Sequence, residues 1–155
     1  MTITGGSFDQ TPAAYVAEGY KVMEKDGKFY VVSEDVEAVV NSKEDLPVDN
    51  NSGKLDTVFE ENTTLFGDIT VSASETTADS SYGATGVQVK DGAVLDGQGH
   101  TLTVNNAWTT WDCIVNTNGG TIKNLTVNGA MRGIFMGSAT ADVYIDNVII
   151  DGTVY

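Results

Sequence analysis

Apolar and polar residues alternate in three short blocks in the second half of the chain. The blocks cover residues 101–105, 124–128 and 147–151, with the sequences TLTVN, NLTVN and NVIID. Leu102, Leu125 and Val148 are 23 residues apart, and Asn or Gly follows each block. Alternation of this kind before a turn-forming residue predicts a β-strand in every block. The constant spacing predicts an internal repeat.

The repeat predicts an all-β fold. No stretch within it has the apolar spacing or the length of a helix. Strand repeats of this size favour a right-handed parallel β-helix with coils of about 23 residues, each coil stacked on the next. Inward side chains would then form aliphatic stacks along the axis, with these members: Leu102 and Val104, Leu125 and Val127, Val148 and Ile150.

Two more strands are expected in each coil, which would make the coil triangular. One set covers residues 86–89, 113–115 and 133–136, and the other covers 93–95, 120–122 and 143–145. Residues 72–85 are polar and are expected to leave the coil as a loop. Asn105, Asn128 and Asp151 are one repeat apart and are expected to stack as a ladder at a corner.

Residues 1–46 predict an N-terminal capping element that covers the open end of the coils. We expect a strand, a short helix at 13–18 with Thr11 as N-cap, and a hairpin at 20–23 and 28–32 around Asp26-Gly27. A strand at 36–40 and a helical turn from Ser42, with Asp45 completing a capping box, would follow. Residues 47–56 are predicted to be a polar linker, and residues 57–155 the coils of the parallel β-helix.

The charge balance narrows the choice of partners. The chain has 22 acidic and 8 basic residues, and its net charge is -14. This excess disfavours nucleic acid and anionic membranes, because both are bound through Lys and Arg. Solubility is the simplest role for the acidity. A row formed by Asp91, Asp96, Asp146 and Asp151 is expected to be a solvated face, with cation binding as the alternative.

Neither a cofactor nor a metal site is predicted. Cys113 is the only cysteine, so an intrachain disulfide is impossible, and a buried, inert thiol is expected. His100 is the only histidine and lacks partners for a zinc site. No apolar run is long enough to insert into a membrane, and the N-terminus has no signal-peptide pattern. The chain would therefore either stay where it is made or be a piece of a longer secreted protein. We expect an extracellular or cell-surface location.

Two segments resemble known proteins. Residues 94–102, VLDGQGHTL, resemble an early coil of the pectin-lyase-like right-handed parallel β-helix superfamily, which includes polysaccharide lyases, polygalacturonases and phage tailspikes. This resemblance covers about residues 57–155 and implies a fold alone. Residues 3–8, 12–16 and 19–22 (ITGGSF, PAAYV and GYKV) resemble repeat segments of large surface proteins of gut Firmicutes.

The catalytic residues of these enzymes are not found, so the chain is predicted not to be an enzyme. Asn116-Thr117-Asn118 resembles a polygalacturonase motif, but an amide at the third position cannot act as an acid or base. Glycoside hydrolysis needs a pair of carboxylates across the bond, and no convincing pair is present. Arg132, the only arginine, is expected to form a surface ion pair, and His100 to hydrogen-bond within a turn.

Three aromatic residues are the candidate binding site. Trp108 and Trp111 lie between predicted strands, and Tyr82 lies in the earlier polar loop. Such side chains can stack on sugar rings or anchor a partner, or they can fold back on the protein. Three functions remain open: a non-catalytic structural or adhesive module of a bacterial or phage surface protein, a carbohydrate-binding degenerate enzyme, and a subunit that assembles end to end into homo-oligomers.

Overall fold

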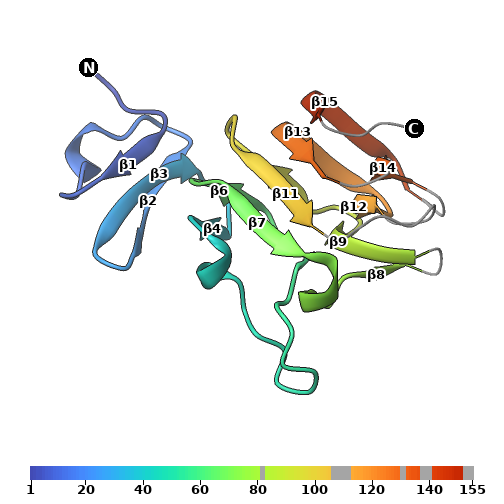
Figure 1. The fold of residues 1–155 in the computed structure, drawn as a ribbon. Coiled ribbons are helices and arrows are strands. Elements are labelled where there is room, and N and C mark those ends of the chain that lie inside the picture. The colour runs from blue at the N-terminus through green and yellow to red at the C-terminus, as the bar shows by residue number, and fades with distance from the viewer. Residues whose placement is uncertain (81–82, 106–112, 130–131, 137–140, 152–155) are drawn as a thin grey trace.

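Strands form nearly all of the regular structure in the computed structural model (Figure 1). It describes residues 1–80, 83–105, 113–129, 132–136 and 141–151. The strands are β1 (Gly6–Phe8), β2 (Tyr20–Lys25), β3 (Lys28–Ser33), β4 (Ala38–Val40), β5 (Val58–Phe59), β6 (Thr63–Leu65), β7 (Ile69–Ser72), β8 (Asp79–Ser80), β9 (Gly83–Val89), β10 (Val94–Asp96), β11 (Thr101–Asn105), β12 (Cys113–Thr117), β13 (Gly120–Asn128), β14 (Arg132–Phe135) and β15 (Val143–Asp151). The helical segments of the described chain are 3-10 turns: η1 (Ala13–Tyr15), η2 (Lys43–Asp45) and η3 (Ala73–Glu75).

A small antiparallel sheet comes first, in the order β1-β3-β2. Its hairpin turns at Asp26 and Gly27, whose φ angles of 52° and 74° suit a type I′ turn, so the predicted hairpin is confirmed. The predicted helix at 13–18 is wrong, because only the turn η1 forms and it has no side-chain cap. From Ser42 the chain also forms a single turn, and Asp45 accepts a hydrogen bond from the Asn41 amide, one residue before the predicted cap.

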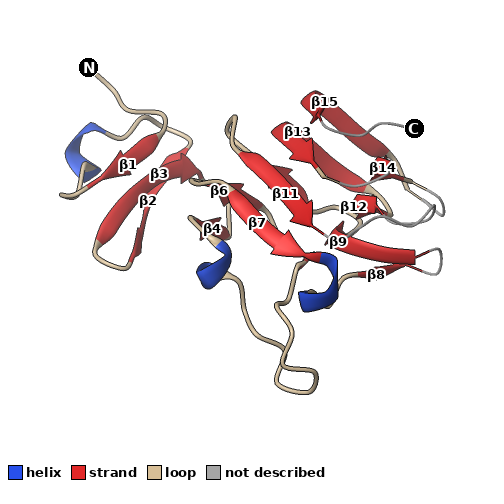
Figure 2. Ribbon diagram, viewed as in Figure 1, coloured by secondary structure: helices blue, strands red, loops and turns tan. Residues whose placement is uncertain are grey.

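Two larger sheets are built almost wholly from parallel strands (Figure 2). The seven-stranded sheet has the order β4-β6-β10-β13-β11-β7, with β15 paired to β13. The five-stranded sheet has the order β14-β12-β9-β5, with β8 antiparallel to β9. The long strand β13 pairs with β10 along its first part and with β11 along its second. The seven-stranded sheet therefore bends, and the sheets curl into a half-barrel around a shared core.

The predicted right-handed β-helix with coils of 23 residues is wrong. The spacing holds between β13 and β15, where Leu125 pairs with Val148. Between β11 and β13, however, Leu102 pairs with Val127, two residues beyond the predicted Leu125. The cause is the corner between β10 and β11, where four residues, 97–100, lie opposite only two in β13. A constant repeat therefore does not describe these sheets.

The main core lies between the two parallel sheets. It contains the aliphatic side chains of β6, β7, β9, β10, β11, β12 and β13. Leu102, Val104, Leu125 and Val127 are all buried, as predicted. The sheets approach closely where one strand carries glycine: a Cβ built on Gly86 would lie 2.3 Å from a methyl group of Val104. Aliphatic bulk on one sheet thus faces a glycine on the other.

A second, smaller core joins the N-terminal sheet to β4. Tyr30, Val32, Val36 and Val39 form it, and the rings of Tyr30 and Phe66 are 4.8 Å apart. Because β4 also pairs with β6, residues 1–46 contribute a strand to the seven-stranded sheet.

The segments predicted as linker and loop make specific contacts with the rest of the fold. Residues 47–56 close on themselves, since the Asp56 amide donates to the Pro47 carbonyl. The Leu55 amide donates to the Glu75 carbonyl in η3. The predicted loop at 72–85 includes η3 and part of β9, and Ala73 and Ala78 are buried.

Gly120 provides a test of how closely the chains pack at the start of β13. Its φ is +91°, and an added Cβ would lie 2.5 Å from the Lys90 carbonyl oxygen. We predict that Gly120→Ala lowers the free energy of unfolding by about 2–5 kcal/mol, from backbone strain and overpacking together. Urea denaturation measures this loss.

Gly99→Ala is the matched control. Gly99 also has a positive φ, +85°, but nothing lies within 4 Å of its added Cβ. This change should cost only about 1–2 kcal/mol, from the backbone conformation alone. Equal losses in the two variants would contradict the close approach at Gly120.

Candidate functional site

The aliphatic columns of the core reach solvent at β15. Ile122 of β13 is fully buried, whereas its register partner in β15, Ile145, is 45% exposed. Val127 is also fully buried, and its partner Ile150 is 54% exposed. Ile150 does pack against β14, because a Cβ on Gly133 would lie 2.7 Å from it. At this end, β14 therefore covers part of the core, and the remaining part is exposed to solvent.

The other face of β15 exposes further large apolar side chains, beside the carboxylates of Asp146 and Asp151. Tyr144 and Ile149 are 61% and 60% exposed, and their partners in β13 are threonines. Among the described strands, β15 pairs with β13 alone. Its second edge thus presents backbone N–H and C=O groups beside exposed aliphatic side chains, an arrangement that promotes pairing with another strand. Figure 1 shows β15 at the end of the sheet farthest from the N-terminal hairpin.

A ladder of polar side chains crosses the corner of the seven-stranded sheet. The amide Nδ2 of Asn147 donates to Oδ1 of Asn124 at 2.9 Å, and Nδ2 of Asn124 donates to Oδ1 of Asp96 at 3.1 Å. The predicted ladder of Asn105, Asn128 and Asp151 is in register only between Asn128 and Asp151, since the partner of Asn128 in β11 is Thr103 and not Asn105. The ladder that forms lies four residues earlier in β13 and β15, at the bend of each strand, and its first member, Asp96, ends β10.

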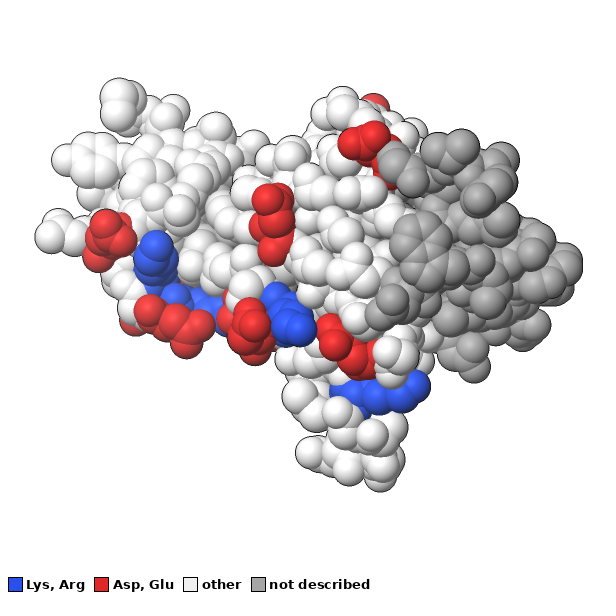
Figure 3. Space-filling view, viewed as in Figure 1, with Lys and Arg blue, Asp and Glu red and all other residues white. Residues whose placement is uncertain are grey.

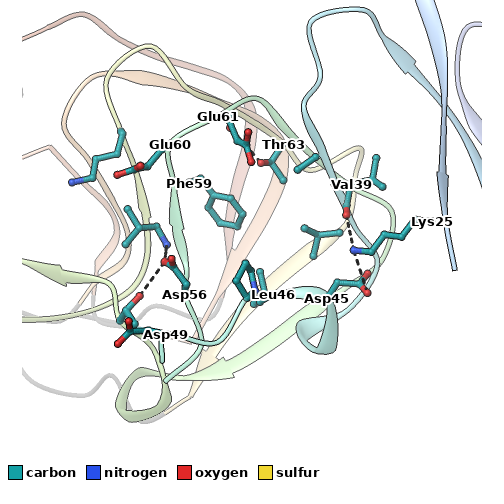
Figure 4. Close-up of a pocket in the computed structure, with 16 residues that line it drawn as sticks. Lys25, Val39, Asp45, Leu46, Asp49, Asp56, Phe59, Glu60, Glu61 and Thr63 are labelled. Carbon is teal, nitrogen blue, oxygen red and sulfur yellow. Dashed lines mark hydrogen bonds and ion pairs between the residues drawn. The ribbon is translucent and has the colours of Figure 1, made fainter. Parts of the chain in front are cut away.

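The opposite end of the half-barrel contains a groove of about 890 Å³ between β4 and β5 (Figure 4). Its apolar floor includes Val39, Leu46 and Phe59. The charged residues around it comprise five carboxylates and two lysines: Asp45, Asp49, Asp56, Glu60, Glu61, Lys25 and Lys90. The groove is thus apolar at its centre and acidic at its rim.

Three of the five carboxylates have local structural roles: Asp56 and Asp49, described here, and Asp45, described below. Asp56 accepts hydrogen bonds from the Val58 amide and the Thr77 hydroxyl. Hydrogen bonds from the Ser52 hydroxyl and amide lower the pKa of Asp49 below its ordinary value. Within the described residues, neither the Glu60 nor the Glu61 carboxylate has a hydrogen-bond or ion-pair partner.

Asp45 connects the N-terminal sheet to the edge of β4. Its carboxylate lies 3.3 Å from the Lys25 ammonium, which also donates to the carbonyl of Val39. Burial raises the pKa of Asp45, but the Asn41 amide and Lys25 together outweigh this and lower the pKa below 3.8. Lys25 thereby occupies a backbone acceptor of β4, so this end of the sheet is protected in a way that β15 is not.

Charged side chains are concentrated along one edge of the face shown in Figure 3, which runs from β2 past η2 to η3. One ion pair on this edge, between Lys43 and Glu75 at 3.3 Å, connects η2 to η3. A side-chain hydrogen bond from Ser42 lowers the pKa of the neighbouring Glu44. These interactions stabilise the groove end of the half-barrel, which is the first end in chain order. At the second end, formed by β15, the described residues make no comparable ion pairs.

Most of the site residues predicted from the sequence lie in neither the exposed edge of β15 nor the acidic groove. Trp108, Trp111 and Tyr82 lie outside the described residues, as do the side chains of Cys113 and Arg132. His100 does lie in a turn, where its amide donates to the Gly97 carbonyl, and its Nδ1 is 3.4 Å from an Asp68 carboxylate oxygen. No group of three or more potential metal ligands occurs in the described part of the chain.

Sequence reasoning allowed for assembly end to end, but it did not identify the side chains that β15 exposes, and it missed the acidic groove. A signal for the exposed side chains was present in Val148, Ile149 and Ile150, three aliphatic residues in a row where a half-buried strand should alternate. That run predicts apolar side chains on both faces. The groove had no comparable signal, because its walls come from segments that are brought together only by the pairing of β4 with β6 and of β5 with β9.

The Lys25–Asp45 contact predicts a pH-dependent contribution to stability. Because the pKa of Asp45 is lowered on folding, its carboxylate stabilises the fold above pH 3.8, and this contribution disappears as the pH falls through the lowered value. We predict that Asp45→Asn costs about 1–3 kcal/mol at pH 7 and progressively less in acid. Thermal unfolding over the acid range measures the difference.

The control for this prediction is Asp9→Asn, at an exposed position. It should leave the free energy of unfolding at pH 7 unchanged. A deficit in Asp45→Asn that stays constant into strong acid would show that the carboxylate charge is not the source of stability.

Comparisons with known proteins leave the chain without an assigned family. A scan against protein-family models, a search of curated proteins and a search of solved structures each found no match. The resemblance to pectin-lyase-like proteins and to surface proteins of gut Firmicutes therefore stays a prediction. In the described residues, no helix has the length and apolar character needed to cross a membrane. The exposed edge of β15 and the acidic groove between β4 and β5 are the candidate binding sites of the described structure.

Proposed function

We propose that this chain is a non-catalytic structural module that binds a neighbouring polypeptide by adding a parallel strand to the outer edge of β15. The observation that carries the proposal is the change in burial along each aliphatic column. Ile122 and Val127 are fully buried in β13, and their counterparts Ile145 and Ile150 are about half exposed in β15. An added strand would continue both columns and cover both side chains.

The energetics favour a weak but specific contact. Full burial of an isoleucine is worth about 1.5–3 kcal/mol, so covering the exposed halves of Ile145 and Ile150 supplies about 2–3 kcal/mol. Backbone hydrogen bonds to the new strand add about 1 kcal/mol each. Ordering the incoming segment opposes these gains. We expect dissociation constants of about 0.1–1 mM for a single short strand.

The two ends of the molecule differ in a way that supports β15 as the docking edge. At the first end, Lys25 and Asp45 occupy the edge of β4, and carboxylates surround the groove. At the second end, the exposed carboxylates of Asp142, Asp146 and Asp151 accompany five exposed large apolar side chains: Met136, Tyr144, Ile145, Ile149 and Ile150. Large apolar patches on a surface usually mark interaction sites. The outside of a cell or virion is the setting proposed for such a module.

Carbohydrate binding through Trp108, Trp111 and Tyr82 stays a prediction, because these residues lie outside the described part of the chain. The acidic groove suits a binding role better than hydrolysis. Asp45, Asp49 and Asp56 are already held by local hydrogen bonds, and glycoside hydrolysis needs two carboxylates placed across the scissile bond.

A synthetic peptide tests the strand-addition proposal. The probe is NGGTIKNLTVNG, the sequence of residues 118–129, which carries the pattern of β13, the strand that already pairs with β15. At peptide concentrations up to about 1 mM, we predict slower amide hydrogen exchange within β15. The control peptide has serine in place of the three aliphatic residues and should give no protection.

Two results would overturn the proposal. One is equal protection of β15 by the two peptides, which would mean that the aliphatic columns do not drive binding. The other is protection confined to the groove end, around β4 and β5.

A further inference from the structure

The strands beside the docking edge bend at asparagine. Asn124 in β13 and Asn147 in β15 both have φ of 51°, in the left-handed region. Most side chains clash with the backbone in this conformation, and asparagine is one of the few residues that adopt it readily. The bend divides each strand into two parts. Consequently, a strand that pairs with β15 along its whole length has to bend at the same point.

The side-chain ladder at this corner has a direction. Asn124 and Asn147 each donate an Nδ2 hydrogen to the layer before, and Oδ1 of Asn124 accepts from Asn147 in the layer after it. Asp96, at the first layer, is an acceptor only, and it also lies 3.4 Å from the Lys123 ammonium. At the last layer, no described group donates to Oδ1 of Asn147. The next layer would therefore have to supply an amide N–H at the bend.

The aliphatic positions have fixed distances from the bend. In β13, Ile122 lies two residues before the asparagine, and Leu125 and Val127 lie one and three residues after it. In β15 the same positions hold Ile145, Val148 and Ile150. A partner that repeats the β13–β15 register would share this spacing, whereas a segment with a longer corner, such as the one between β10 and β11, would not.

We infer that β15 selects a partner segment with the pattern aliphatic–any–Asn–aliphatic–any–aliphatic, which runs parallel to β15 and has its asparagine in the left-handed conformation. This inference rests on the proposed strand addition and deepens it. Both columns and the polar ladder, which involve different atoms, lead to the same register. Continuity with the existing β13–β15 pairing thus defines what covers the edge.

Two arrangements of a folded second copy do not fit this description. In a folded copy, β13 already has β10 and β11 on one side and β15 on the other. The edge of β15 itself, in a two-fold dimer, would meet its counterpart antiparallel, and the ladder would not continue in one direction. The occupant is therefore an unpaired segment of a partner chain that becomes ordered when it docks.

Peptides that differ at one position test this inference. The parent is NGGTIKNLTVNG, and its variants carry Gly or Leu in place of the asparagine that corresponds to Asn124. Glycine keeps the left-handed conformation but lacks the amide, and we expect binding about fivefold weaker. Leucine has no side-chain amide and adopts the left-handed conformation only at a cost, so we expect binding about 30-fold weaker or more. Affinities come from titrations followed by amide exchange within β15.

A double-mutant cycle isolates the ladder. Asn147→Gly in the protein should weaken binding of the parent peptide about fivefold, but it should cause no further loss for the glycine peptide. Exchange of the β13 amides in this variant checks that β15 still pairs with β13. Additive losses in the cycle would overturn the ladder as the means of recognition.

The outcomes separate this inference from the proposed function. If all three peptides bind equally and the serine control does not, strand addition stands and selection of asparagine is wrong. If the parent peptide gives no protection of β15, both are wrong. A leucine peptide that binds as well as the parent would overturn the required left-handed bend, whatever the glycine peptide does.

Discussion

Burial of aliphatic side chains between two curled parallel sheets is the constraint on which the rest of this structure depends. Parallel strands are usually covered on both faces, and here the inner faces of the two larger sheets cover each other. Ile69, Leu102 and Val127 lie in register across neighbouring strands and are almost fully buried. Each such side chain contributes about 1.5–3 kcal/mol. The glycines on the facing sheet, such as Gly86, allow the contact.

This constraint also explains the difference between the two ends. An aliphatic side chain in such a column is fully buried only where its strand has a neighbouring strand on both sides. The inward side chains of the outermost strands therefore need other groups to shield them from solvent. At the first end, the N-terminal sheet packs against Val39 of β4 and against Phe66, which follows β6, and Lys25 with Asp45 protects the edge. At β15 the columns and the asparagine ladder end together. The same surface is therefore incomplete in its apolar contacts and in its hydrogen bonds.

Local features could be predicted from the sequence, and the register could not. Asp26-Gly27 identified the hairpin because a type I′ turn needs two residues with positive φ. Alternation identified Leu102, Val104, Leu125 and Val127 as buried. The corner between β10 and β11, however, holds two residues more than the bend at Asn124, and this shifts Leu102 onto Val127. Of the binding residues proposed from sequence, the aromatic set remains untested, and the exposed edge of β15 emerged only from pairing.

The register between β11, β13 and β15 is the most direct test of this account. In an isotope-labelled sample of the full chain, NMR cross-strand contacts between backbone protons report which residues lie opposite one another. The account predicts contacts that place Leu102 opposite Val127, and Val127 opposite Ile150. Contacts that instead place Leu102 opposite Leu125 would contradict it, because the columns that end at β15 would then consist of different residues.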